Sequence, residues 1–221
     1  TPSNSSAASD VYKRQIKYNK QSNYCKGDKM KLYYKGKYDL NPESLPHGNH
    51  KPGAVMFQEP KDSKTLSLLL TKISLIIIVV LGIIAIIRCK NYLTNSFWQI
   101  ISGCIAPILI IFPHEILHAI CFKEDVYLYT NLAQGMLFVT GVESMSKSRY
   151  VFMSLLPNIV FGLVPYIIGL IFPNLIFFVV FGIISISMGA GDYYNTYNAI
   201  TQMPKGAKTY LYQFNSYWYM P

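Results

Sequence analysis

Long apolar runs alternate with short polar segments over the C-terminal two thirds of the chain. A helix needs about 20 mostly apolar residues to cross a bilayer. Four runs reach this length, and they extend over 66–87, 97–122, 151–172 and 174–194. Only Pro173 separates the last two runs, so we expect them to form a tight helical hairpin. The pattern predicts an all-α membrane protein with four transmembrane helices.

Several prolines interrupt these runs. They stand at positions 107, 113, 157 and 165. Proline is tolerated inside a membrane helix where neighbouring groups satisfy the carbonyls that it frees, and it often marks a bend near a site. We therefore expect bent helices in the second and third runs.

Between the second and third runs the pattern changes to short β-like segments. Val126–Thr130 and Met136–Thr140 are rich in aromatic and β-branched residues, with a glycine in the segment between them. This pattern predicts a short cytoplasmic β-hairpin. A strand is also expected at 209–214, and Lys31–Tyr34 is a candidate short strand. The hairpin could accept an extended substrate peptide at its edge, and a plain amphipathic cap is the alternative.

The chain divides by composition into four parts. Residues 1–15 resemble the translation of a transposon end used in sequencing-library preparation, and we set them apart as a sequencing artefact. Residues 16–65 are polar, basic and rich in turn residues, which indicates a cytoplasmic arm. Residues 66–200 form the expected four-helix membrane domain, and residues 201–221 form a cytoplasmic tail.

Charge is scarce and unevenly distributed. Hydrophobic residues make up 51% of the chain and charged residues 14%, with a net charge of +9. A soluble domain has about 25% charged residues. Twelve of the 20 Lys and Arg residues precede Leu66, which is typical of a cytoplasmic flank attracted to anionic lipid. We find no nucleic-acid-binding signature among them and expect no nucleic-acid partner. The four cysteines form no Cys-x-x-Cys pair and are interpreted as free thiols.

The basic residues also predict an orientation. With four spans, the arm, the loop 123–150 and the tail share one side of the membrane, and they hold twelve, three and two basic residues. The other side holds only Arg88 and Lys90. Because Lys and Arg favour the cytoplasmic side, we expect a multi-pass protein of the cell membrane with both termini in the cytoplasm.

Ionisable residues inside the apolar runs are costly and suggest function. Five occur, namely Lys72, His114, Glu115, His118 and Asp192. The His114-Glu115-x-x-His118 pattern places two imidazoles on one face of a helix, where they can share a zinc ion, with a carboxylate beside it. Two buried histidines bonded to the backbone are the alternative. A zinc site explains the pattern better, because so many polar groups in an apolar helix need compensation.

Asp192 is the candidate for a third ligand, since catalytic zinc usually takes three from the protein. His114 lies 17 residues after the second run begins, and Asp192 lies 18 residues after the fourth begins. At about 1.5 Å per residue, both lie roughly 26 Å from the outer face, near the cytoplasmic surface. A water-exposed carboxylate at a helix end is the alternative for Asp192. Glu124 and Glu143 are the other possible ligands, and we expect both to be solvated charges.

The segments Pro113–Ala119, Leu156–Asn158, Gly191–Asp192 and Met203–Ala207 resemble the zincin peptidase family of bacterial membrane proteins. The chain is also similar, more distantly, to site-2 proteases. The resemblance implies that His114, His118 and Asp192 are zinc ligands and that Glu115 is the catalytic base.

The sequence therefore predicts an integral membrane zinc metalloendopeptidase that cleaves a membrane-bound or membrane-proximal peptide near the cytoplasmic face. Zn²⁺ polarises the scissile carbonyl, and Glu115 transfers the protons. Asn158 is a candidate substrate-binding residue, with helix packing as its alternative role. A non-catalytic metal-binding membrane protein, such as a transporter component or an inactive protease homologue, is the alternative function. Glu115 favours catalysis, because a binding site needs no carboxylate between its histidines.

Overall fold

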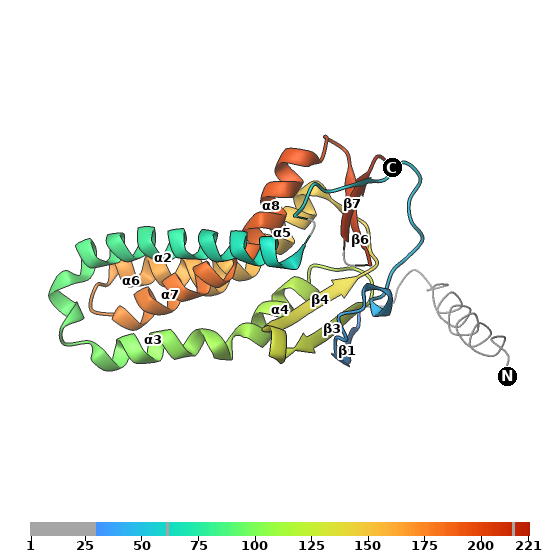
Figure 1. Ribbon diagram of the computed structural model, residues 1–221. Helices are drawn as coiled ribbons and strands as arrows, with labels where there is room; N and C mark the ends of the chain where they lie inside the picture. The colour runs from blue at the N-terminus through green and yellow to red at the C-terminus, as the bar shows by residue number, and fades with distance from the viewer. Residues whose placement is uncertain (1–29, 61, 214) are drawn as a thin grey trace. The chain divides into compact units, whose positions relative to one another are not determined.

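Four apolar helices lie side by side in the computed structural model (Figure 1). They are α2 (Ser63–Leu93), α3 (Phe97–Leu109), α6 (Val164–Ile171) and α7 (Ile176–Met188). The structure describes residues 30–60, 62–213 and 215–221. Contacts divide the chain into 1–30 and 31–221, and the second unit is described below. The expected artefact at 1–15 and the first part of the expected arm lie outside the described residues.

Helix α7 is the central helix of this bundle and packs against α2, α3 and α6. Its buried Val179 belongs to the same apolar cluster as Ala85 of α2 and Tyr166 of α6. The approach to α6 is close, because a Cβ added at Gly182 would lie 2.6 Å from the backbone nitrogen of Tyr166. Small residues allow such contact between helix backbones, so Gly182 sets the spacing of the two helices.

The outward faces of the bundle are apolar. Only 6% of the most apolar 18-residue stretch of α2 is buried inside the protein. Two helices of the described chain, Lys64–Leu93 and Lys147–Ile171, are long and apolar enough to cross a membrane. The number rises to four if each of two bent helix pairs counts as one span. The four apolar runs of the sequence correspond to these helices and pairs.

Both bent pairs end in a short helix that carries polar residues. Helix α3 continues at an angle of 44° into α4 (Ile111–Ala119), and α7 continues at 51° into α8 (Ala190–Gln202). Pro113 explains the first bend, because its ring clashes with the carbonyl of Leu109, the last residue of α3. The second bend lies at Gly189, between the two helices.

The long helix Lys147–Ile171 changes its winding in the middle. It consists of α5 (Lys147–Pro157), the π-helical segment η3 (Asn158–Leu163) and α6. Pro157 and Pro165 remove two backbone donors from this helix. Single π turns inside α-helices are frequent at functional sites, and η3 begins at Asn158, which faces the polar centre described below.

Two β-sheets accompany α4, α5 and α8 (Figure 1). The first has the order β1-β3-β4, with β1 parallel to β3 and β3 antiparallel to β4. The second is antiparallel, with the order β2-β7-β6-β5. The strands are β1 (Leu32–Lys37), β2 (Val55–Met56), β3 (Val126–Asn131), β4 (Met136–Gly141), β5 (Met145–Ser146), β6 (Lys208–Tyr212) and β7 (Asn215–Tyr219). Short 3₁₀ turns η1 (Pro42–Ser44) and η2 (Leu132–Gln134) complete the elements.

The expected all-α class with a single β-hairpin is therefore wrong. The hairpin is present as β3 and β4, and the expected strands at Lys31–Tyr34 and 209–214 correspond to β1 and β6. However, β1 pairs with β3, and β6 belongs to a second sheet in which β2 from the arm pairs with β7 of the tail. The described parts of the arm and the tail are thus strands of two sheets rather than polar extensions. The physical reason is that both sheets join strands that lie far apart along the chain, and a local pattern does not reveal which strands pair.

Candidate metal centre

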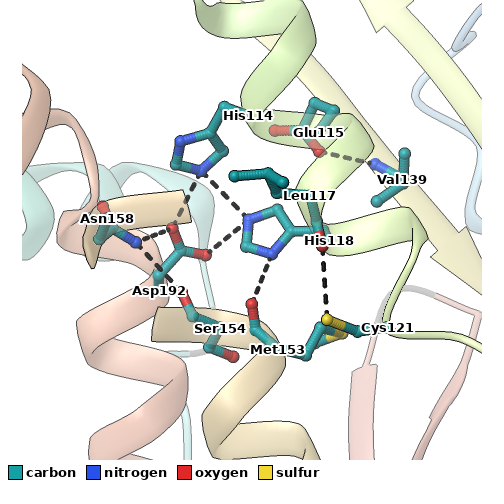
Figure 2. Close-up of polar contacts among 10 residues, drawn as sticks. All are labelled: His114, Glu115, Leu117, His118, Cys121, Val139, Met153, Ser154, Asn158 and Asp192. Carbon is teal, nitrogen blue, oxygen red and sulfur yellow. Dashed lines mark hydrogen bonds and ion pairs between the residues drawn. The ribbon is translucent and has the colours of Figure 1, made fainter. Parts of the chain in front are cut away.

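Helix α4 carries the His-Glu-x-x-His motif and presents both histidines on one face. The Nε2 atoms of His114 and His118 lie 3.1 Å apart (Figure 2). Positions i and i+4 of a helix are neighbours on its surface, so the spacing of the motif produces this contact directly. His118 is only 8% exposed, which makes an unsatisfied nitrogen there costly.

Asp192 on α8 faces the two histidines across the site. Its Oδ2 lies 3.2 Å from His114 Nε2, and its Oδ1 lies 3.4 Å from His118 Nε2 (Figure 2). The two bent helix pairs bring these side chains together although 74 positions separate His118 from Asp192 (192 − 118). His114 and Asp192, which residue counting along their spans places at the same depth, therefore do lie side by side.

The three donor groups fit a tetrahedral metal ion. Ligands bound to zinc at about 2.0–2.1 Å in tetrahedral geometry are about 3.3–3.4 Å from one another. The two Nε2 atoms lie 3.1 Å apart, and they lie 3.2 Å from Asp192 Oδ2 (His114) and 3.4 Å from Asp192 Oδ1 (His118), which is close to that value. Two histidines and one carboxylate are also a donor set that catalytic zinc uses. The residues present are therefore suited to zinc.

Glu115 is the other acidic candidate for a ligand. One of its carboxylate oxygens is within 4.8 Å of donor atoms of both histidines. However, Glu115 Oε2 accepts a hydrogen bond of 3.0 Å from the backbone nitrogen of Val139 in β4. Asp192 approaches both Nε2 atoms more closely, so it fits the third position better than Glu115.

A backbone carbonyl fixes the orientation of His118. His118 Nδ1 lies 2.9 Å from the carbonyl oxygen of Met153 in α5, which can only accept, so Nδ1 donates the proton (Figure 2). Nε2 then offers its lone pair to a metal, as in metal sites whose histidines donate their other N–H to a carbonyl. This carbonyl is free because residue 157, which would normally donate to it, is proline. Pro157 thus makes the partner of His118 available.

Asn158 orients Asp192 from the first residue of the π segment. Its Nδ2 donates to Asp192 Oδ2 at 2.8 Å and to Ser154 O at 3.1 Å. Asn158 is 4% exposed, and among the described residues its Oδ1 has no hydrogen-bond partner. The substrate contact expected of Asn158 stays a prediction, because the contacts seen are to Asp192 and to the backbone.

Replacing Gly189 by alanine is expected to lower zinc affinity about 10- to 100-fold, the usual effect of disturbing a partner of a metal ligand. The backbone at Gly189, with φ −76° and ψ 11°, suits any residue. The added Cβ, however, would lie 1.7 Å from Asn158 Oδ1 and push this amide away from Asp192. Competition with a zinc chelator measures the affinity. Gly191→Ala is the matched control, because its Cβ would meet nothing within 4 Å; an equal loss in both variants would contradict the prediction.

Glu143 and Arg149 hold the chain that follows α4. Arg149 forms an ion pair with Glu143 and donates from Nε and Nη2 to the carbonyl of Cys121, at 2.9 and 2.6 Å. Glu143 Oε2 accepts from the backbone nitrogens of Lys123 and Glu124, at 2.6 and 3.2 Å. Burial tends to raise the pKa of Glu143, but the guanidinium and the two amides outweigh it and lower that pKa. The expectation that Glu143 is a solvated charge is therefore wrong.

A cavity of about 530 Å³ lies beside the two histidines and Asp192. Strand β4 lines it along its whole length, and α4, α5, α8 and β6 also contribute to its walls. A volume of 300–1,000 Å³ is typical of pockets for ligands. The site therefore faces a space large enough for a segment of a peptide.

A His-Glu-x-x-His helix that faces such a cavity is typical of the zincin class of metallopeptidases. Residues 107–208 match the family described as "Putative zincin peptidase". This match contains the motif and Asp192, and it confirms the resemblance to that family. No curated protein and no solved structure matches the chain significantly. The more distant similarity to site-2 proteases stays a prediction.

The sequence did not single out three other groups of the site. They are the Met153 carbonyl, the Val139 amide and the Arg149 side chain. Two of them are backbone atoms, which carry no signature of their own in a sequence. Only Pro157 gave a signal, since a proline inside a helix leaves the carbonyl four residues earlier without its donor.

Proposed function

We propose that this protein is an integral membrane zinc metalloendopeptidase. The observation that supports it most is the triangle of donor atoms formed by His114 Nε2, His118 Nε2 and the carboxylate of Asp192. The family match over residues 107–208 supports metallopeptidase chemistry. In this proposal His114, His118 and Asp192 hold zinc, and Glu115 is the general base.

When bound, zinc is a Lewis acid that polarises a peptide carbonyl and lowers the pKa of water. Glu115 accepts a proton from the attacking water on a carboxylate oxygen and later delivers it to the amine of the leaving peptide. Asn158 keeps Asp192 aimed at the two imidazoles, and Met153 O keeps His118 in the tautomer with a free Nε2. These contacts hold the reacting groups in place before a peptide arrives.

The proposed partner of the bundle is membrane lipid. Large apolar side chains face outward along α2 and α3, and Trp98 at the start of α3 is 78% exposed. Tryptophan at a helix end is typical of the boundary between lipid and water. We propose that the bilayer surrounds α2, α3, α6 and α7, while the sheets and the described parts of the arm and tail lie on the cytoplasmic side. The excess of basic residues in these parts supports this orientation.

The position of the site suggests the class of substrate. Helices α3 and α7 have 13 residues each, or about 20 Å of length before their bends. The site follows those bends, so it lies toward the cytoplasmic end of a hydrocarbon layer of about 30 Å. A peptide bond that reaches this level belongs to a membrane-bound or membrane-proximal chain, which we propose as the substrate.

The test begins with the metal and the activity of the purified protein. We expect stoichiometric zinc by mass spectrometry and cleavage of members of a synthetic peptide library in detergent micelles. Treatment with 1,10-phenanthroline should abolish cleavage, and added zinc should restore it, because the zinc ligands remain intact. Protein without zinc would contradict the proposal. Zinc without cleavage of any peptide would favour the non-catalytic metal-binding alternative.

A further inference from the structure

Strand β4 has a free edge that points toward the site. The backbone nitrogen of Val126 in β3 donates to Lys31 O on the side of β1, at 2.9 Å. Along a strand, every second residue faces the same neighbour, so Leu128 also faces β1 and its partner Val139 faces away from β3. Among the described residues, no strand pairs with this side of β4. The N–H and C=O groups of Leu137, Val139 and Gly141 therefore belong to the open edge.

Glu115, the proposed catalytic base, accepts a hydrogen bond from one backbone N–H of this edge, that of Val139. Val139 N donates to Glu115 Oε2 at 3.0 Å (Figure 2). A carboxylate oxygen of Glu115 also lies within 4.8 Å of donor atoms of His114 and His118. Glu115 thus reaches from α4 across the space between the histidines and β4.

A peptide strand added to β4 would occupy the space between β4 and the two histidines. Residues 136–141 of β4 and residues 114, 115 and 118 of α4 line the same cavity. An extended peptide can add to a free sheet edge through backbone hydrogen bonds. A strand added to β4 would place one of its carbonyls against the N–H of Val139. A backbone N–H is a single donor, so the peptide and Glu115 would compete for it.

We propose that the Val139 N–H is a switch that passes from Glu115 to the substrate backbone. In the resting protein this amide holds the Glu115 carboxylate at the edge of β4. When a peptide adds to β4, its carbonyl takes the amide, and Glu115 is released toward the histidines and the attacking water. Val139 is thus a positioning residue that makes the base available only when the cavity is occupied. This inference rests on the proposed function, because it gives Glu115 the role of base.

Amide hydrogen exchange tests the resting half of the switch without any activity. Glu115→Ala removes the acceptor, and we expect the Val139 amide to exchange at least about tenfold faster, since a hydrogen-bonded amide must open before it exchanges. The amides of Leu137 and Gly141 on the same edge are the internal control and should keep their rates. An unchanged rate at Val139, or an equal rise at all three positions, would overturn the proposal.

Kinetics of two Val139 variants test the catalytic half. Val139→Pro removes the N–H, and proline is tolerated in an edge strand where the N–H side is unpaired; Val139→Ala keeps the N–H. Val139→Ala is therefore the reference for loss of the side chain alone. With the library peptide that the wild type cleaves fastest, we expect the proline variant to show a severalfold higher KM than the alanine variant without a lower kcat. A fall in kcat at unchanged KM would mean that the amide holds Glu115 in its productive position, which overturns the switch.

The two arms separate this inference from the proposed function. If the wild type binds zinc and cleaves no peptide, the proposed function fails, while the exchange experiment still decides whether Val139 holds Glu115. If peptides are cleaved and the proline variant has the same KM and kcat as the alanine variant, the switch fails and the peptidase assignment stands. If Val139→Pro does not fold, the exchange rates in Glu115→Ala decide.

Discussion

Glu115→Gln is expected to lose peptide hydrolysis while zinc stays bound. A general base contributes about 10²- to 10⁴-fold to the rate, and glutamine cannot accept the proton. The amide oxygen of glutamine can still accept the hydrogen bond from Val139 N, so the edge of β4 should be undisturbed. The measurements are kcat/KM with a library peptide and zinc content by mass spectrometry.

Glu43→Gln is the control for this substitution, because Glu43 lies in η1 and outside the residues that line the cavity. It should retain both zinc and activity. Two results would contradict the assignment of Glu115 as base. Activity of Glu115→Gln within tenfold of the wild type would remove its catalytic role. Loss of zinc would make Glu115 a ligand, since its carboxylate lies within 4.8 Å of the donor atoms of the histidines.

The helices were predictable because their signal is local. An apolar run of about 20 residues can be read without knowing what it packs against. The expected bend in the second run is present, but the third run forms one helix, Lys147–Ile171, and the other bend lies at Gly189 in the fourth run. Pro113 lies where α3 breaks from α4, and Pro157 leaves Met153 O free for His118. The general rule that neighbours satisfy the carbonyls freed by proline thus applies here to a residue of the site.

The depth of Asp192 could be predicted because it depends only on the rise per residue and the direction of the helix. The packing of side chains does not enter this estimate. Both helix pairs bend, by 44° and 51°, shortly before the site residues. Because His114 and Asp192 each follow such a bend, counting residues along straight helices still placed them at the same depth in the membrane.

The sheets could not be predicted in the same way. The candidate strand at Lys31–Tyr34 is present as β1, but its parallel partner β3 lies more than 80 residues further along the chain (126 − 37 = 89), and β2 has only two residues. Such pairing depends on a partner that a local pattern does not reveal. The environment of Glu143 could not be predicted for a related reason. Its sequence neighbours are polar, but Arg149 and two backbone amides surround it in the fold.

Asp192→Asn is expected to reduce zinc affinity by more than about 100-fold, which exceeds the effect of losing a partner of a ligand. Asparagine has nearly the same shape, so packing between α8 and α5 should persist. It lacks the negative charge that faces both Nε2 atoms, at 3.2 and 3.4 Å. Its amide nitrogen would also meet Asn158 Nδ2, a donor, unless the side chain turns over. Chelator competition measures the affinity, and cleavage of the library peptide should fall with it.

Glu124→Gln is the control that distinguishes Asp192 from the other acidic candidate. Glu124 is exposed and lies in the loop after α4, at the position where a glutamate ligand following the motif was considered. We expect this variant to bind zinc as tightly as the wild type. If Glu124→Gln loses zinc and Asp192→Asn keeps it, the two-helix site is wrong and the third ligand comes from the loop. If only Asp192→Asn loses zinc, the bend at Gly189 is what completes the metal centre, because it turns α8 and its carboxylate toward α4.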